Sequence, residues 1–296
     1  VRILADEVAS QVALHAQFGG VVPEIASRQH TRCITQLTEK ALAECGVPVD
    51  AVAATTGPGL MGSLLVGVNF AKALSYAWRV PFVPVHHLEG HIYSAFLGES
   101  RPAFPFLALI VSGGHTSLVR CDSPHVYATI GATRDDAVGE CFDKVARLLG
   151  LPYPGGPAIQ KAAEAGDPRA VDFPRGMAKA DSLDFSYSGL KTAVLYRLRE
   201  NGGRVEDLAA SFQHAAVDTP LIKTQAAPRL TGYRTLVLAG GVAANRLLRD
   251  RLRDELPREL GVTVCVPPLK LCMDNGSMIA AAACSRLAHG LIGDLR

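Results

Sequence analysis

The sequence predicts an α/β fold, and three observations support that prediction. Short apolar runs rich in β-branched residues alternate with longer stretches in which apolar residues recur at helical spacing. Three of the short runs end in glycine-rich turns, a common end for strands in layered α/β proteins. Hydrophobic residues make up 48% and charged residues 20% of the 296-residue chain, which supplies enough apolar material for folded cores and excludes global disorder. A chain of this length suggests about two domains.

The predicted elements follow one another as strand, helix and strand. Residues 106–112 read as a buried strand, and residues 116–120, after Gly113 and Gly114, are expected to form its hairpin partner. Trp78, the single tryptophan, ends an apolar helix and is predicted to lie in the core. The expected strands are residues 51–56, 82–85, 106–112, 235–239 and 262–266, and the expected helices include residues 64–78, 245–256 and 278–288.

Composition excludes several classes of protein. The net charge is only +2, from 30 basic and 28 acidic residues, so a nucleic acid could bind only through a local patch or a helper protein. The seven cysteines form no C-x-x-C pair, which argues against a disulfide framework and against a cysteine zinc site. They are typical of reduced thiols in a cytoplasmic protein. No uncharged apolar run reaches the ~18 residues that a membrane span needs.

The glycine-rich turns are the first candidate for ligand binding. They lie at residues 57–59, 112–116 and 239–242. Glycine has no Cβ, so the backbone at such turns can approach a ligand and offer its N–H groups to an anion. Three turns of this kind in one α/β chain favour a nucleotide or another phosphorylated ligand. None of them fits the dinucleotide-binding or P-loop pattern.

A metal site is the second candidate. His87 and His91 are four residues apart, which on a helix places both imidazoles on one face. A carboxylate from the polar loop at residues 272–277 could complete the set, and two histidines with one carboxylate suit Fe(II) or Zn(II). A metalloprotease motif needs a glutamate directly after the first histidine, whereas Glu89 stands two residues after His87 and about 200° around the helix.

Two further segments are polar enough to bind a ligand. Residues 134–144 are interpreted as an acidic helix start, with Asp135, Asp136, Glu140 and Asp143 near one face. Acidic residues there could hold ligand hydroxyls or could only complement the helix dipole. Residues 185–192 resemble a loop entering a helix, where Ser188 could bind a ligand or cap the helix.

Taken together, the motifs resemble the bacterial TsaD family, the tRNA N6-adenosine threonylcarbamoyltransferases once described as O-sialoglycoprotein endopeptidases. The resemblance covers essentially the whole chain. The segments that carry it, in order, are GGVVPEIASR at 19–28, GPGL at 57–60, His87 with His91, VSGGHT at 111–116, GECFDK at 139–144, PGG at 154–156, FSYSGLKT at 185–192, AGGVAAN at 239–245 and DNG at 274–276.

The resemblance implies a two-lobed fold of the actin-like ATPase, sugar kinase and Hsp70 (ASKHA) type, with two ribonuclease-H-like lobes and a ligand cleft between them. The first lobe would be residues 1–104 with 276–296, and the second residues 105–275. The implied enzyme is an acyltransferase in tRNA processing. It would move the threonylcarbamoyl group of threonylcarbamoyl-AMP to N6 of the adenosine 3′ to the anticodon, in tRNAs that read ANN codons.

The same resemblance implies the site residues and the partners. His87, His91 and Asp274 would bind one Fe(II) per chain, or Zn(II). The adenylate, or an ATP-like or ADP-like nucleotide in the cleft, would bind Ile110, Val111, Ser112, Gly113, Gly114, Asp143, Gly156 and Asn245. No nucleophilic side chain is implied, since the carbamoyl carbonyl is already activated by AMP. The expected partners are tRNA, a TsaB-like paralogue and a TsaE-like ATPase, in the cytoplasm and without a membrane.

The chain departs from the family pattern at its start. Residues 1–10 correspond to what should be a third strand, and the first two strands with the phosphate-facing turn between them are missing. We therefore expect an N-terminally truncated, incomplete first lobe with an exposed apolar edge. Three other functions therefore stay open. They are an inactive homologue or partner-binding scaffold, a small-molecule kinase of the actin-like fold, which would lack the metal set, and a metalloprotease, already weakened by the position of Glu89.

Overall fold

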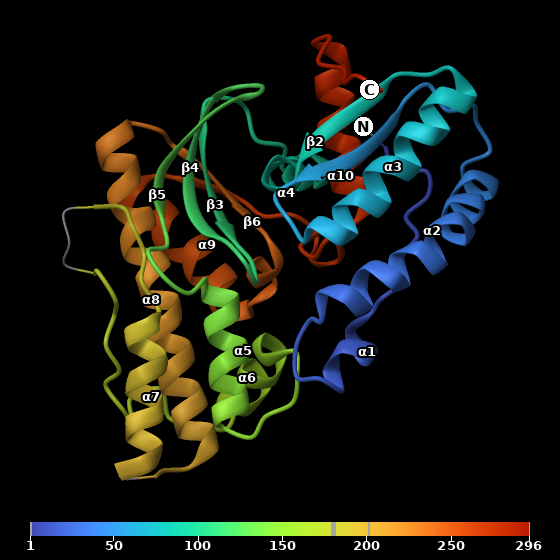
Figure 1. Cartoon of the computed structure of the whole chain (residues 1–296). Helices are drawn as coiled ribbons and strands as arrows, with labels where there is room; N and C mark the ends of the chain where they lie inside the picture. The colour runs from blue at the N-terminus through green and yellow to red at the C-terminus, as the bar shows by residue number, and fades with distance from the viewer. Residues whose placement is uncertain (1, 179–181, 201, 296) are drawn as a thin grey trace. The chain divides into compact units, whose positions relative to one another are not determined.

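A computed structural model describes residues 2–178, 182–200 and 202–295. The chain divides into two compact units (Figure 1). Unit 1 comprises Val1–Glu99 and Asp274–Arg296, and unit 2 comprises Ser100–Met273. Each unit contains a β-sheet with helices packed on it, so both are α/β, as the sequence predicts.

Unit 2 is built on a five-stranded mixed sheet of order β5-β4-β3-β6-β7. Strand β3 pairs antiparallel with β4 and parallel with β6, so the hairpin expected after Gly113 and Gly114 is confirmed. β3 has a continuous apolar sequence and is buried at every position, as expected of a central strand. The strands are β3 (Phe106–Val111), β4 (Thr116–Ser123), β5 (Val126–Ala132), β6 (Thr235–Ala239) and β7 (Thr263–Cys265).

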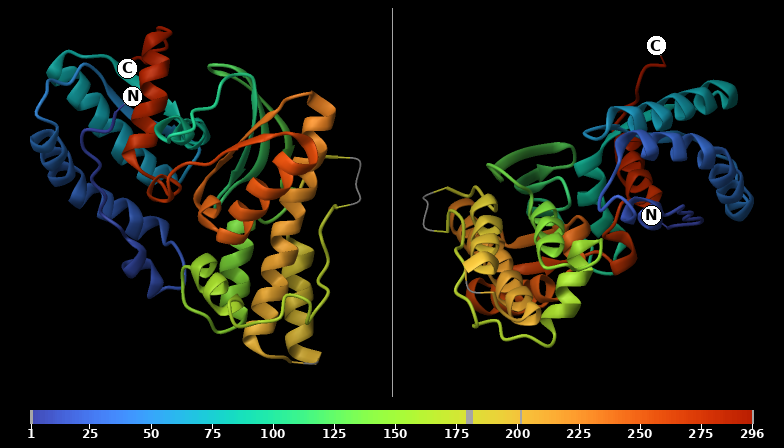
Figure 2. Two further views of the ribbon diagram at one scale, coloured as in Figure 1. Left: turned by 180° about the vertical axis from the view of Figure 1, so that it is seen from behind. Right: turned by 60° about the horizontal axis from the view of Figure 1, so that its bottom comes forward.

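The core of unit 2 lies between this sheet and its helices. Leu107, Leu109 and Val111 share one face of β3 and belong to the same buried cluster as the apolar faces of the helices. The long helix α8 runs beside α7 in every view (Figures 1 and 2). The helices are α5 (Val138–Leu148), α6 (Gly155–Ala163), α7 (Ser188–Glu200), α8 (Val205–Thr231) and α9 (Arg246–Leu260), with the 3₁₀ turns η2 (Gly241–Ala244) and η3 (Leu269–Leu271).

Unit 1 contains two parallel strands joined by a crossover helix. Helices α3 and α10 both contact the strands, and α10 also packs along α4. The strands are β1 (Val52–Gly57) and β2 (Phe82–His86). The helices are α1 (Val12–Ala16), α2 (Pro23–Cys45), α3 (Met61–Trp78), α4 (His87–Ser94) and α10 (Gly276–Ala288), with the 3₁₀ turn η1 (Ala95–Leu97).

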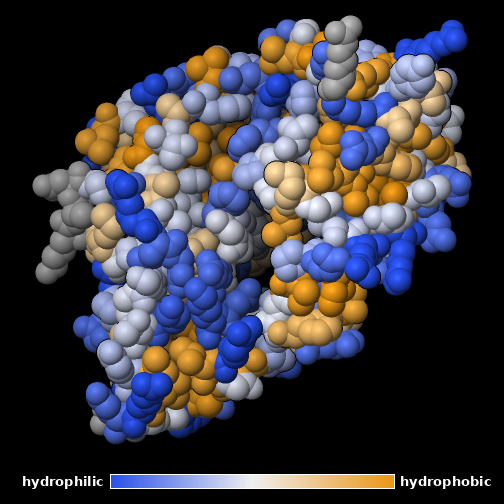
Figure 3. Space-filling view, in the orientation of Figure 1, coloured by the Kyte–Doolittle hydropathy of each residue, from blue (hydrophilic) through white to orange (hydrophobic). Residues whose placement is uncertain are grey.

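The prediction that Trp78 lies in the core is wrong, because its side chain is 39% exposed at the end of α3. Helix α3 is apolar on most of its faces, so the sequence does not show which face is covered. Apolar surface gathers over this helix (Figure 3). The exposed apolar residues at its two ends are Leu60, Met61, Leu65, Tyr76 and Trp78.

Among the described helices, none combines the length and the apolar character needed to cross a bilayer.

Candidate metal centre and ligand-binding turns

The three predicted metal ligands lie together in unit 1. Strand β2 ends at His86, and α4 begins at the next residue, so His87 and His91 occupy one face of the first turns of that helix. Asp274 precedes Asn275, whose side chain accepts the N–H of Met278 at 2.8 Å and so caps α10. The cap fixes the point from which the Asp274 carboxylate reaches the two histidines.

The distances within this triad suit a shared cation. Oδ1 of Asp274 lies 3.2 Å from Nε2 of His91 and 3.6 Å from Nε2 of His87. One ligand atom from each of the three residues lies within 4.8 Å of the other two. A metal about 2.0–2.2 Å from each donor separates neighbouring donors by roughly 3–3.5 Å, so small shifts would bring these atoms into coordination.

Burial supports the same interpretation. The His91 side chain is 0% exposed, and neither of its ring nitrogens makes a hydrogen bond within the described part of the chain. A buried ring nitrogen that makes no hydrogen bond is costly, and a metal ion bound at Nε2 would lower that cost at this nitrogen. Two nitrogen donors and one carboxylate form a set that suits Fe(II) or Zn(II).

In unit 2, two glycine-rich turns meet at one edge of the sheet. β3 and β6 are adjacent and parallel, so Ser112 and Gly240, which follow them, lie at the same edge. There Gly240 has a φ of +92°, and a Cβ on it would lie 2.4 Å from the carbonyl oxygen of Val111. Only glycine allows the two turns to come this close.

Helix α5 begins against the first of these turns. The N–H of Val138 donates to Oγ1 of Thr116 at 2.8 Å, and the N–H of Gly139 donates to the carbonyl of Ser112 at 3.2 Å. A Cβ on Gly139 would lie 2.6 Å from that same carbonyl oxygen. The turn therefore supplies partners for N–H groups that the helix start itself leaves unpaired.

Two kinds of glycine can be distinguished here. Gly155 packs against the backbone, since its Cβ would lie 2.5 Å from Cα of Asp143. Gly113, Gly114 and Gly156 would have nothing within 4 Å of a Cβ, so their backbone faces open space. The first kind holds the elements together, and the second leaves main-chain groups accessible to a ligand.

Asp143 joins α5 to the start of α6. Its Oδ1 accepts the N–H of Gly155 at 2.7 Å. Burial raises the pKa of this carboxyl above its ordinary value, while the hydrogen bond from Gly155 and the charge of Arg147 oppose that shift. A half-buried carboxylate of this kind can accept hydrogen bonds from ligand hydroxyls.

The other predicted ligand residues are held by the protein itself. Asn245 accepts the N–H of Leu248 at 3.0 Å and donates to Gln213 at 2.9 Å, so it caps α9. Ile110 and Val111 have side chains that are 0% exposed, and they define the end of β3. The contact between Asn245 and Gln213 could not be read from the sequence, because Gln213 lies on the distant helix α8.

The acidic helix predicted for residues 134–144 is only partly correct. Helix α5 begins at Val138, so Asp135 and Asp136 precede it and do not share a helix face with Asp143. Asp135 instead accepts hydrogen bonds from the segment that starts α7. The donors are Oγ of Ser186 (2.6 Å), N–H of Tyr187 (2.7 Å), and N–H (3.2 Å) and Oγ (2.7 Å) of Ser188.

Burial alone would raise the pKa of Asp135, but these donors together hold it below its ordinary value. The sequence left open whether Ser188 binds a ligand or caps a helix. In the structure its hydroxyl donates to Asp135. The sequence marks both segments as polar but does not show that they bind each other.

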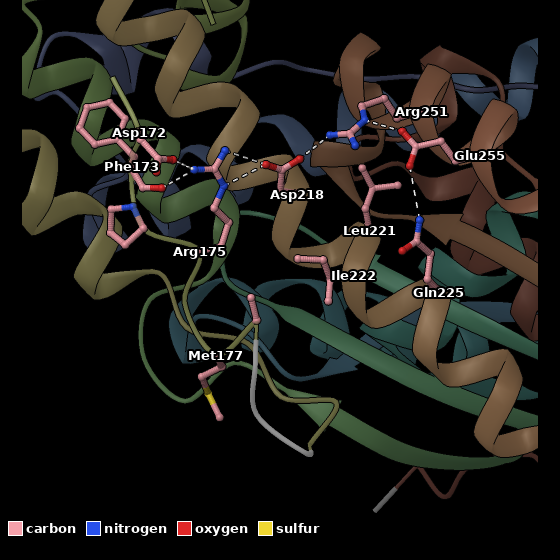
Figure 4. Close-up of a pocket in the computed structure, with 12 residues that line it drawn as sticks. Asp172, Phe173, Arg175, Met177, Asp218, Leu221, Ile222, Gln225, Arg251 and Glu255 are labelled. Atoms are coloured by element: carbon pink, nitrogen blue, oxygen red, sulfur yellow. Dashed lines mark hydrogen bonds and ion pairs between the residues drawn. The ribbon is translucent and has the colours of Figure 1, made fainter. Parts of the chain in front are cut away.

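A separate cavity of about 630 Å³ lies between residues 172–178, α8 and α9 (Figure 4). Arg175 and Arg251 both donate to Asp218, and Arg251 also donates to Glu255 at 2.7 Å. The charged side chains of this cavity thus compensate one another. Its lining shares no residue with the glycine turns or the histidine triad.

Solved structures support the predicted fold. Full-length HypF in its phosphate- and nucleotide-bound form aligns with 86% of this chain at a TM-score of 0.66 and 16% identity. HypF of T. kodakarensis aligns with 87% at a TM-score of 0.64 and 15% identity. The chain spans less than half of either HypF chain, 41% and 44% respectively. At these identities the likeness concerns the fold alone, and it confirms the predicted ASKHA type.

Sequence relatives are much closer. The family model described as TsaD, tRNA N6-adenosine threonylcarbamoyltransferase, matches residues 2–281. A protein of Bordetella petrii with that name is 52% identical over 299 aligned residues, which cover 98% of this chain and 86% of the relative. One of Anaeromyxobacter dehalogenans is 50% identical, covering 98% and 89%. The chain therefore belongs to the TsaD family of tRNA N6-adenosine threonylcarbamoyltransferases and is an enzyme of the transferase class.

Proposed function

We propose that this chain transfers the threonylcarbamoyl group of threonylcarbamoyl-AMP to N6 of the adenosine 3′ to the anticodon, in tRNAs that read ANN codons. The observation that carries this proposal is the identity of about half, over nearly the whole chain, to proteins named for that reaction. A tRNA substrate also favours the cytoplasm as the place of action.

The proposed metal ligands are His87, His91 and Asp274, with Fe(II) as the resident ion and Zn(II) as the alternative. Their spacing supports this assignment, as does the burial of His91, whose ring nitrogens make no hydrogen bond among the described residues. When bound, such an ion supplies Lewis acidity toward a carbonyl or phosphoryl oxygen. Neutral imidazoles and an ionised carboxylate are the states that bind metal, and the chain's own task is to hold these three donors close together.

The proposed adenylate ligands are the predicted residues of unit 2. Accessible N–H groups at Gly113, Gly114 and Gly156 would face the phosphate, and Asp143 would accept hydrogen bonds from the ribose hydroxyls. In the reaction, the N6 amine attacks the carbamoyl carbon, and the bond from that carbon to the phosphate oxygen breaks. AMP leaves with the bonding electron pair, and the proton that the amine loses passes to solvent. Positioning two reactants in this way supplies much of the rate enhancement, because the acyl group is already activated.

A transfer assay tests the proposal. The purified, Fe(II)-loaded chain is mixed with threonylcarbamoyl-AMP, an unmodified tRNA that reads an ANN codon, a TsaB-like partner and a TsaE-like ATPase. The tRNA is then digested, and threonylcarbamoyl-adenosine is sought by mass spectrometry. We expect product with wild type and with His86→Ala, a neighbouring exposed histidine outside the triad, and its loss with His91→Ala. No product from a metal-loaded wild type with both helpers present would contradict the proposed reaction.

A further inference from the structure

The proposed metal ligands come from helix α4 and from the residue just before the cap of α10, and these two segments are separated in the sequence by the whole of unit 2. His87 and His91 lie on α4, whereas Asp274 is placed by the capped start of α10. The separation between Oδ1 of Asp274 and the two histidine nitrogens therefore depends on how α10 is seated along α4. A slide of α10 by one ångström would change these separations by a similar amount.

Glu89 makes the most deeply buried charged contact between these helices. Its side chain is 3% exposed, and its Oε2 accepts a hydrogen bond from Nη1 of Arg286 at 2.9 Å. A carboxylate buried to this degree is stable only when it is paired, so a shift of either helix that broke the contact would be strongly disfavoured. Ion pairs of this kind can fix register even where they add little net stability.

Two neighbouring contacts also fix the position of α10 along α4. A Cβ on Gly90 would lie 2.6 Å from Cδ1 of Ile279, so the helices approach closely at that residue. The hydroxyl of Tyr93 donates to Oγ of Ser285 at 2.8 Å. Glu89, Gly90 and Tyr93 thus contact α10 while His87 and His91 are directed to Asp274.

We propose that the Glu89–Arg286 ion pair is a positioning element for the metal centre, which sets the register of α10 on α4 and so brings Asp274 to the two histidines. The inference rests on the metal centre proposed above. Glu89 and Arg286 do not bind the ion themselves. They act through the helices that carry its ligands.

The experiment measures Co²⁺ binding to the whole chain under anaerobic conditions, with the visible d–d absorption of the ion as a report of ligand geometry. Arg286→Met removes the cation but keeps most of the aliphatic stem, and Glu89→Gln removes the anion at nearly constant shape. We expect each to weaken Co²⁺ binding by about tenfold or more and to shift the absorption bands, as substitutions behind metal ligands commonly do. Arg286→Lys should recover part of the affinity.

A matched control is Lys40→Met, which breaks another ion pair of unit 1, with Glu7 at 2.7 Å, and should leave Co²⁺ affinity unchanged. The double variant Glu89→Gln/Arg286→Met separates positioning from stability. It leaves no buried charge unpaired, so its thermal midpoint should recover relative to Arg286→Met, while its Co²⁺ affinity stays low.

The possible failures are distinguishable. If wild type binds Co²⁺ and His91→Ala does not, but Arg286→Met keeps wild-type affinity and spectrum, the positioning role is wrong and the metal centre stands. If wild type binds no Co²⁺, the proposed metal centre and the positioning role of the ion pair are both wrong. If Arg286→Met does not fold, Glu89→Gln and Arg286→Lys decide, since unchanged affinity and spectrum in both would overturn the inference.

Discussion

Oδ1 of Asp143 accepts the N–H of Gly155 at 2.7 Å, so a half-buried carboxylate ties the first residue of α6 to the middle of α5. The same carboxylate is a proposed ligand for the adenylate ribose. Holding Gly155 and binding the ribose both use the ionised carboxylate, and burial destabilises that form in the folded protein.

Replacing this residue should therefore raise stability and lower ligand affinity. The folded pKa of Asp143 lies above the ordinary 3.8, so the wild type loses stability as pH rises from 3.8 through the folded value. Asp143→Asn keeps an oxygen that can accept the Gly155 N–H but cannot ionise. We expect a higher thermal midpoint for Asp143→Asn at pH 7, with the difference shrinking toward pH 3. We also expect adenylate binding to weaken about tenfold, which corresponds to one hydrogen bond to a charged group. A variant less stable than wild type at pH 7 would contradict this account.

Two adjacent glycines should respond differently to the same substitution. In Gly155→Ala the new methyl group meets the backbone of Asp143 and Phe142, so we expect a loss of about 1–3 kcal/mol in the free energy of unfolding. In Gly156→Ala it meets nothing within 4 Å, and alanine favours the helix by up to about 1 kcal/mol. Stability should then be kept or raised while adenylate affinity falls. Chemical denaturation and a binding titration on both variants measure the contrast, and equal effects on stability would refute it.

The metal assignment predicts a sharp dependence on single side chains. His91→Ala and Asp274→Ala should each reduce bound Fe(II) from one ion per chain to nearly none. His86→Ala should leave it at one, because His86 lies outside the triad. Metal analysis after anaerobic loading and desalting gives the stoichiometry. Full occupancy in His91→Ala would show that the ion binds elsewhere.

Asp135 should make unit 2 sensitive to acid. Partial desolvation opposes the shift, but hydrogen bonds from Ser186, Tyr187 and Ser188 hold the pKa of Asp135 below 3.8. Its contribution to stability is therefore present above the unfolded value and is lost as pH falls through the folded value. Asp135 is exposed, so solvent screens its charge, and Asp135→Asn should lower stability by less than about 1 kcal/mol at pH 7, and by still less as the pH falls below 3.8. Thermal midpoints between pH 7 and 2.5 measure this, with the exposed Asp250→Asn as control. A constant deficit at every pH would argue against the assigned cause.

The sequence predicts the strands of unit 2 well because their apolar runs and the glycine-rich turns that end them are local signals. Strands 106–112 and 235–239 and the hairpin at 116–120 are found within a residue or a few of their predicted limits. The gathering of His87, His91 and Asp274 follows from the family resemblance. Helical spacing alone accounts only for the histidine pair.

Other features could not be predicted because they depend on contacts between distant segments. The bonds from residues 186–188 to Asp135 and the pairing of Glu89 with Arg286 join parts of the chain that no local pattern connects. The exposure of Trp78 depends on which face of an apolar helix is covered, and the sequence does not specify this. Periodicity identifies elements, whereas their neighbours are decided by packing.

The packing of α4 against α10 has a consequence for the order of folding during synthesis. Unit 2 is one continuous stretch, Ser100–Met273, inserted between these two helices. At roughly 5–20 residues per second, a ribosome needs about 10–40 s to pass from α4 to the end of α10. Throughout that time Glu89 and His91 lack the partners that bury them, while unit 2 can already fold as a unit. Helix α4 therefore stays uncovered by α10 until unit 2 and then α10 have been synthesised, although unit 2 can fold before that contact forms.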